Sequence, residues 1–286
     1  MTEVSWPVDL HAHSTFSDGE LDPVALVHLA ARRGVRVLAL TDHDTMAGVA
    51  SAHEAAVAQG IELVPGVEMT VWHRHEVHLL AYFIDPDDAA FARLLEVRSA
   101  SRRDRVREIA ARLETLGAPI DADAVLAACK DGNVGRPHLA RALIAAGHCH
   151  DANEAFDRFL GREGRAYVPA SHLPIAEAMD AVHQAGGVAV LAHPGVEKID
   201  ESLPELAGLG LDGLEAHHPA HGFADTARYL GVCQLYGLKA TGGADFHGHP
   251  GAAPPGAFGV SVPGFEALRN LRPSGRPAST VVESGS

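Results

Sequence analysis

The stretch Asp9-Leu10-His11-Ala12-His13-Ser14-Thr15-Phe16-Ser17-Asp18-Gly19 stands near the start of the chain, directly after the apolar residue Val8. In an extended strand, residues two positions apart point to the same face, so His11 and His13 present both imidazoles on one side. The strand then gives way to a loop of small polar residues, from which Asp18 could turn back toward the same point. Two imidazoles and a carboxylate that face one point predict part of a metal site.

Apolar strands that end in polar residues recur along the chain. Seven are expected, over residues 8–10, 35–40, 61–67, 77–83, 187–192, 211–216 and 238–243. Helices expected over residues 23–33, 46–59 and 176–185 separate several of these strands. This alternation predicts an α/β fold in which the strands form a parallel barrel, with the chemistry at their carboxyl ends.

The middle third of the chain lacks this rhythm. Four helices are expected there, over residues 98–116, 121–129, 137–146 and 152–160, and the first is rich in arginine. The net charge of the whole chain is −14, yet residues 97–168 hold slightly more basic than acidic residues. We therefore expect a first barrel part over residues 1–96, a helical insertion subdomain over 97–168 and a second barrel part over 169–286.

The composition is that of a soluble globular protein, with 47% apolar and 21% charged residues among 286. Cys129, Cys149 and Cys233 are far apart and odd in number, which is typical of free thiols in a reducing compartment. The sequence shows neither a leader peptide nor an apolar run long enough to span a membrane. A cytoplasmic protein with no membrane contact and no obligatory protein partner is expected.

Polar residues at or near the strand ends form a set of candidate metal ligands. Imidazoles and carboxylates without cysteine suit Mn²⁺, Zn²⁺ or Fe²⁺, and Mn²⁺ is the ion we expect first. The set is too large for one ion, so it predicts a cluster of two to three divalent ions. Its members are His11, His13, Asp18, His43, Glu68, His78, His193, Asp245 and His247.

These motifs, taken in order, resemble the PHP (polymerase and histidinol phosphatase) family of metal-dependent phosphoesterases. The resemblance rests on the opening stretch and on Thr41-Asp42-His43-Asp44, Gly66-Val67-Glu68, Ala192-His193-Pro194 and Asp245-Phe246-His247. It implies a distorted seven-stranded (β/α) barrel. Within the family, the arginine-rich insertion and Gly135-Arg136-Pro137-His138 resemble the branch that includes 3′,5′-nucleoside bisphosphate phosphatases.

The resemblance also implies how the ligands are shared among three ions. The first ion would take His11, His13, Glu68 and Asp245; the second Glu68, His78 and His193; the third Asp18, His43 and His247. Other members have a histidine where Asp18 stands, so the third site departs from the family pattern. Related amidohydrolases that cleave C–N bonds often use a lysine at a strand end, and none of the three lysines of this chain ends an expected strand.

The expected reaction is hydrolysis of the 3′-phosphate of a nucleoside 3′,5′-bisphosphate, which yields the nucleoside 5′-monophosphate. Arg102, Arg103 and Arg136 are the candidates for binding a second phosphate, because an acidic protein needs local positive charge to hold an anionic substrate. His218 or His221 would protonate the leaving oxygen, and His221 would also contact the substrate. Asp18 and His43 are counted with these histidines as catalytic residues.

Three alternatives remain open from the sequence. A 5′–3′ exonuclease on short RNA could use the same site, although aromatic residues for base stacking are few. A histidinol-phosphate-type phosphatase would need a single phosphate pocket. A non-catalytic metal-binding module would keep the ligands without turnover.

Overall fold

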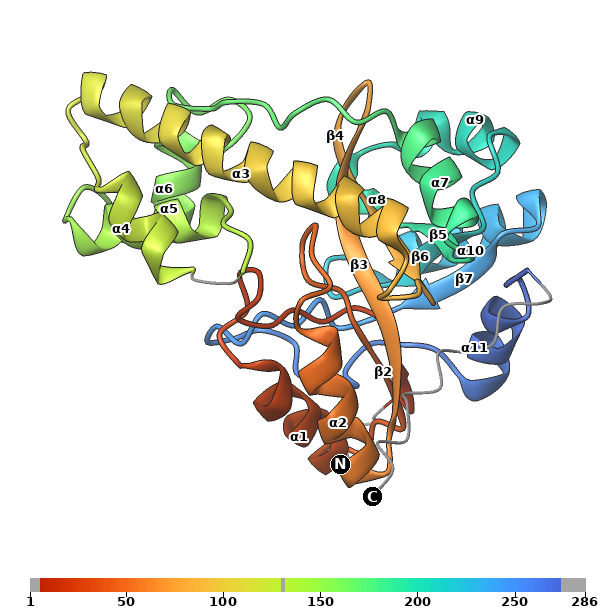
Figure 1. The fold of residues 1–286 in the computed structure, drawn as a ribbon. Helices are drawn as coiled ribbons and strands as arrows, with labels where there is room; N and C mark the ends of the chain where they lie inside the picture. Colours follow the sequence, from red (N-terminus) through yellow and green to blue (C-terminus); the bar gives the residue numbers. More distant parts are fainter. Residues whose placement is uncertain (1–5, 130–131, 274–286) are drawn as a thin grey trace.

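Seven strands form one sheet in chain order, and the sheet curls into a nearly closed barrel (Figure 1). The computed structural model describes residues 6–129 and 132–273. Leu10 N donates to Gly242 O over 3.1 Å, which joins the segment after the first strand to the last strand. The strands are β1 Val8–Asp9, β2 Val37–Leu40, β3 Glu62–His73, β4 His75–Tyr82, β5 Val188–Leu191, β6 Gly213–His217 and β7 Lys239–Gly242.

The prediction that every strand is parallel is wrong for β4. β1, β2 and β3 are parallel, as are β5, β6 and β7, but β4 is antiparallel to both of its neighbours. β3 continues beyond Glu68 to His73, and the chain reverses at Arg74, which has a φ of 56°. A non-glycine residue in this left-handed conformation gives no turn signal in the sequence, so the hairpin was not expected.

The reversed direction of β4 explains how His78 joins the other candidate ligands. In β1, β2, β5 and β7 the ligands lie after the carboxyl end and in β3 Glu68 lies past the middle, whereas His78 lies in the first half of β4 and pairs with Thr70 of β3. Because β4 runs the opposite way, its first residues lie at the same end of the barrel as the carboxyl ends of the other strands.

Helices cover the outside of the barrel (Figure 1). Asp22 caps the first of them by accepting from Ala25 N over 2.8 Å, and Pro23 follows at the first helical position, where its missing N–H costs nothing. The helices are α1 Pro23–Arg32, α2 Val49–Gln59, α7 Ile175–Gln184, α8 Pro194–Glu197, α9 Leu203–Gly208, α10 Phe223–Tyr236 and α11 Val262–Arg269, with a 3₁₀ turn η2 at Asp200–Ser202. Of the helices in the described residues, none is long and apolar enough to cross a membrane.

The insertion packs around its own apolar core beside the barrel (Figure 1). It comprises α3 Ala89–Thr115, α4 Ala122–Ala128, α5 Arg136–Ala145, α6 Ala152–Ala155 and the π-helical turn η1 Phe156–Leu160. α3 begins well before the predicted residue 98, because Asp88 accepts from Ala90 N and Phe91 N and so caps an earlier start.

The first part of α3 packs against the barrel and the second part against the insertion. Phe91 and Leu95 belong to the barrel core, and Val106, Ile109 and Leu113 belong to the core of the insertion. The predicted boundary at residue 97 therefore falls inside one continuous helix, and the division into subdomains stays a prediction.

Candidate metal centre and substrate pocket

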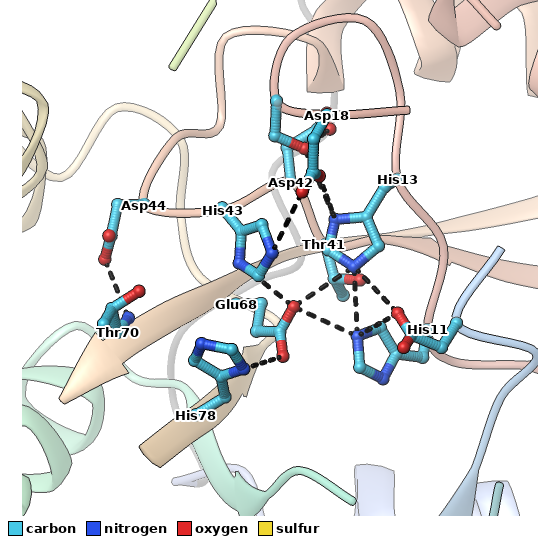
Figure 2. Close-up of polar contacts among 12 residues, drawn as sticks. His11, His13, Asp18, Thr41, Asp42, His43, Asp44, Glu68, Thr70 and His78 are labelled. Atoms are coloured by element: carbon cyan, nitrogen blue, oxygen red, sulfur yellow. Dashed lines mark hydrogen bonds and ion pairs between the residues drawn. The ribbon is translucent and has the colours of Figure 1, made fainter. Parts of the chain in front are cut away.

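All nine candidate ligands meet at one end of the barrel. Figure 2 shows Glu68 between His78 on one side and His11 and His13 on the other, with Asp18 reaching in from the loop after β1. Their ring nitrogens and carboxylate oxygens form groups that are close enough to share metal ions. The folded chain thus brings together residues from the first, second, third, fourth, fifth and seventh strand regions.

The first group contains His11, His13, Glu68 and Asp245. His11 Nε2 lies 3.1 Å from His13 Nε2, and each of these nitrogens lies 3.1 to 3.2 Å from Glu68 Oε2 and 3.2 Å from Asp245 Oδ1. Atoms that bind one tetrahedral ion with bonds of about 2.0 Å lie roughly 3.3 Å apart, close to the distances between the two nitrogens and the two carboxylate oxygens here. The group therefore fits a divalent ion.

Glu68 extends from the first group to a second. Its Oε1 lies 3.1 Å from His78 Nδ1 and 3.0 Å from His193 Nε2, while its Oε2 faces the first group. His43 Nδ1 also lies 3.2 Å from Glu68 Oε2. One buried carboxylate with an oxygen on each side can bridge two ions.

Asp18, His43 and His247 form a third group, to which His13 also contributes. His247 Nε2 lies 3.2 Å from Asp18 Oδ1, and His43 Nε2 lies 3.6 Å from Asp18 Oδ2. Burial opposes ionisation of Asp18, but His247 and His43 hold its pKa well below the usual range. Asp18 can therefore act as an anionic ligand in place of the usual histidine.

Two of the candidate ligand histidines, His78 and His247, have raised pKa values and so hold protons near the sites where the ions would bind. Burial lowers the pKa of His78 but the Glu68 carboxylate raises it, to about 9, and Asp18 likewise overcomes burial to raise the pKa of His247 to about 10. Among the described residues, His43 Nδ1, His193 Nδ1 and Asp18 Oδ1 are buried without a hydrogen-bond partner. Buried ligand atoms that lie near opposite charge but make no well-formed hydrogen bond, next to imidazoles charged by neighbouring carboxylates, suit a metal centre that exchanges protons for ions.

Two adjoining cavities open from the ligands. One has a volume of about 160 Å³ and lies between the barrel and the insertion, where Asp18, His43 and His78 face Arg102 and Arg136. The other has a volume of about 450 Å³. It is bounded by Glu68, His193, Asp245 and His247 on the ligand side, and by Arg136, Arg162 and Lys198 elsewhere. His43, His78 and Arg136 line both cavities.

The three predicted phosphate-binding arginines have different surroundings. Arg136, at the start of α5, donates from one nitrogen to Glu76 Oε1 over 2.9 Å and faces both cavities. Arg102 Nε donates to Asp44 Oδ2 over 2.7 Å, and its NH2 group donates to Thr70 Oγ1. Arg103 lines neither of the two cavities. The geometry thus favours Arg136 and, after it, Arg102 as contacts for an anion.

The PHP domain family model matches residues 9–165, which is more than half of the chain. This range includes the candidate ligands from His11 to His78. The chain belongs to the PHP family. A 5′-3′ exoribonuclease of Haemophilus influenzae is 37% identical over 245 residues, covering 84% of this chain and 89% of that protein. A 3′,5′-nucleoside bisphosphate phosphatase of Chromobacterium violaceum is 35% identical over 247 residues, covering 84% of this chain and 87% of that protein.

A solved structure agrees with this assignment. A protein of Bifidobacterium adolescentis described as a metal-dependent phosphoesterase superposes with a TM-score of 0.85 at 32% identity, covering 94% of this chain and 97% of that one. The chain is therefore a PHP phosphoesterase with a barrel of the family type, and its clustered histidines and carboxylates can bind metal ions.

The two histidines predicted as proton donors in this PHP chain differ in their freedom to act. His218 lines the larger cavity; its Nδ1 accepts from Ala220 N, and its Nε2 lies 3.3 Å from Asp245 Oδ2. His221 is tied to the backbone at both ring nitrogens, since Nε2 accepts from Gly195 N over 3.1 Å and Nδ1 donates to Ala216 O over 3.1 Å. This arrangement favours His218 over His221 as the proton donor, and the predicted roles of His221 stay a prediction.

Several carboxylates that hold the PHP ligands in place were not singled out from the sequence. Glu215, fully buried in β6, lies 3.0 Å from His11 Nδ1 and accepts from His193 N over 2.9 Å. Asp42 accepts from Ser14 and Ser17, whose hydroxyls approach His13 and the loop that carries Asp18. The available signal was a charged residue inside an otherwise apolar strand, which must have a buried partner.

Glu76 connects the insertion to the barrel of this PHP chain. Its carboxylate accepts from Arg105 NH2 and Arg136 NH2, both over 2.9 Å, and from Ala170 N over 3.1 Å. Burial raises the pKa of Glu76 but Arg136 and Arg105 lower it, to about 2. The residue is therefore ionised at neutral pH and fixes the position of Arg136 at the cavity wall.

Proposed function

We propose that this PHP phosphoesterase hydrolyses the 3′-phosphate of nucleoside 3′,5′-bisphosphates to give the nucleoside 5′-monophosphate and phosphate. The observation that carries the proposal is the cavity that has candidate metal ligands on one wall and Arg102 and Arg136 on the other. A substrate with two phosphates could place one at the ligands and the other at Arg136. The name of the Chromobacterium violaceum relative supports the same substrate.

The divalent ions would be held by the three groups that contain Glu68, Asp18 and their partner histidines. When bound, such ions lower the pKa of a water molecule and neutralise charge on the phosphoryl oxygens. The side chains of the protein supply the remaining steps. Arg136 donates charge-assisted hydrogen bonds to the second phosphate, and Glu76 keeps its guanidinium at the cavity wall. Arg102, held by Asp44 and Thr70, adds positive charge beside it.

His218 is the proton donor that we assign to the leaving 3′-oxygen. Because its Nδ1 accepts from Ala220 N, its ring proton resides on Nε2, which points toward Asp245 at the ligand cluster. His221 is the weaker candidate, because it lines neither cavity and both of its ring nitrogens bind backbone groups. Protonation of the sugar oxygen as the ester bond breaks avoids release of a strongly basic alkoxide.

A 5′–3′ exoribonuclease activity is the second candidate. The larger cavity carries Arg162 and Lys198 in addition to Arg136, so a chain of several nucleotides would meet further cations. The name of the Haemophilus influenzae relative supports this activity. Histidinol phosphate suits the site less well, since it has one phosphate and a cationic amine that Arg136 and Arg102 would repel.

The deciding measurement is kcat/KM for a panel of substrates with the metal-loaded protein. We expect 3′,5′-bisphosphoadenosine to exceed 3′-AMP, 5′-AMP and histidinol phosphate by orders of magnitude, with 5′-AMP and phosphate as products. Equal turnover of the single-phosphate compounds would remove the case for a second anion pocket. A 5′-phosphorylated oligoribonucleotide with a higher kcat/KM than the bisphosphate would establish the exoribonuclease instead.

A further inference from the structure

Glu197 is a buried carboxylate in the wall of the larger cavity, outside the predicted ligand set. It ends the short helix α8, which begins directly after His193. Its Oε2 accepts from Arg162 NH2 over 3.1 Å, and its backbone oxygen lies 2.9 Å from His75 Nε2. Arg162 of the insertion thus holds the side chain, with Oε1 turned toward the ligand cluster, and His75 of β4 contacts its backbone.

Glu197 Oε1 faces two imidazole nitrogens at distances that do not suit hydrogen bonds. It lies 3.5 Å from His78 Nδ1 and 3.6 Å from His193 Nδ1, beyond the usual N–H···O range. Two ligands on one tetrahedral ion, with bonds of about 2.0–2.2 Å, lie roughly 3.3–3.6 Å apart. His193 presents Nε2 to Glu68 Oε1 over 3.0 Å and the buried Nδ1, which has no hydrogen-bond partner among the described residues, to Glu197 Oε1, so it can give one of these two nitrogens to an ion between the carboxylates.

The charge at the second ligand group also leaves room for another carboxylate. Its only carboxylate in the predicted set is Glu68, which it shares with the first group through the opposite oxygen. A doubly charged ion with two neutral imidazoles and half of one carboxylate keeps most of its charge in a buried site, which is costly. A carboxylate from Glu197 reduces that charge by one unit.

We propose that Glu197 is a direct ligand of the second metal ion, together with Glu68, His78 and His193. Atoms of His78, His193 and Glu197 lie within 4.8 Å of one another, so a small shift of the side chains brings all three to one ion. The inference rests on the metal dependence of the phosphoesterase and not on the substrate proposed above. A failed substrate assignment leaves it standing, because its test needs no substrate.

The test titrates Co²⁺ into metal-free protein and records both the number of bound ions and the visible absorption of each. In Glu197→Gln we expect one ion to bind at least about tenfold more weakly, with an altered absorption band for that ion. The matched control is Glu201→Gln, which removes an exposed carboxylate from the adjoining turn η2 and should bind like the unaltered protein. Unchanged stoichiometry, affinity and absorption in Glu197→Gln would overturn the proposal.

Two further variants separate coordination from other roles of Glu197. Arg162→Ala removes the partner of Oε2 but leaves Oε1 in place, so it should weaken metal binding less than Glu197→Gln does; an equal loss would assign the effect to the Arg162–Glu197 ion pair and count against coordination by Oε1. Glu197→Asp keeps the charge but shortens its reach, so a purely electrostatic role keeps the affinity whereas a coordinating role loses it. This variant also decides the matter if Glu197→Gln melts well below the control in metal-free form.

Discussion

Glu68 makes the candidate ions interdependent, because one side chain serves two groups of ligands. Its Oε2 lies near His11 and His13, and its Oε1 lies near His78 and His193. An ion bound in either group would orient the carboxylate for the other group and would share its negative charge. Residues that hold the bridging arrangement should therefore affect more than one ion.

Glu215→Gln should weaken metal binding by about 10- to 100-fold, since partners that orient metal-binding histidines have effects of this size. Glu215 accepts from His193 N and faces His11 Nδ1, whereas an amide has one acceptor oxygen for these two donors. Competition with a chromophoric chelator measures the loss. Glu205→Gln, at an exposed carboxylate, serves as the control, and equal affinities of the two variants would contradict the orienting role.

Arg136→Ala should lower kcat/KM for 3′,5′-bisphosphoadenosine by the worth of a charge-assisted bond, about 1.5–3 kcal/mol or roughly 10- to 150-fold. Metal content should not change, because Arg136 contacts Glu76 and no candidate ligand. Arg141→Ala, an exposed change on the same helix, is the matched control. If Arg136→Ala keeps its full kcat/KM, then Arg136 serves only to join the insertion to the barrel.

The sequence was informative about residues that follow strands and less so about residues within them. His11, Glu68, His193 and Asp245 stand out because each comes at the end of an apolar run, where the strands of a barrel bring polar side chains together. Glu215 is inside β6, and its partner His11 is far away in the chain, so nothing local reveals the contact. For His221 the sequence could show a histidine near the site but not that backbone groups occupy both of its nitrogens.

Among the elements, the β3–β4 hairpin contributes residues both to the ligand cluster and to the contact between the insertion and the barrel. It carries Glu68 and His78 toward the ions, and Glu76 near its turn toward the arginines. Strand positions were predictable from apolar runs, but the direction of β4 was not. Residues 72–76 read Trp-His-Arg-His-Glu, without the glycine, proline or asparagine that usually marks a tight turn.

Glu76→Ala should lower the free energy of unfolding by about 3–5 kcal/mol, because it leaves Arg105 and Arg136 partly buried without their counter-charge. Urea denaturation of the metal-free protein measures this change. Asp104→Ala removes an exposed ion pair with Arg107 on α3, and the loss there should stay below about 1 kcal/mol. Similar values for the two variants would show that Glu76 is not a structural anchor.

For the molecule as a whole, metal ions and protons compete for one buried cluster. Without metal, the pKa of His78 is about 9 and that of His247 about 10, both above the ordinary value of 6.5, because neighbouring carboxylates outweigh burial. A histidine with a raised pKa stabilises the fold fully below its unfolded pKa and loses that contribution as the pH rises through the folded value.

The melting temperature of the metal-free protein should therefore fall as the pH rises from about 7.5 to about 9.5. His43, whose pKa burial lowers to about 3, is already neutral over this range and adds no slope. The metal-loaded protein should show a smaller decline, since ions replace the protons. Parallel melting curves with and without metal would contradict the exchange of protons for ions.

The continuity of α3 bears on how the distance between two phosphate groups would affect substrate selection. Since this one helix is embedded in both apolar cores and Arg102 ties it to Asp44, no loop or hinge within α3 separates the ligand cluster from Arg102, and Glu76 of β4 holds Arg136 of α5 at the same cavity. The distance between the metal ligands and the arginines is then set by the folded chain and not by the substrate. Under the proposed function, a nucleotide with phosphates on the 3′ and 5′ oxygens of its ribose should reach both places, and a 5′-diphosphate, whose phosphates are adjacent, should be the poorer substrate.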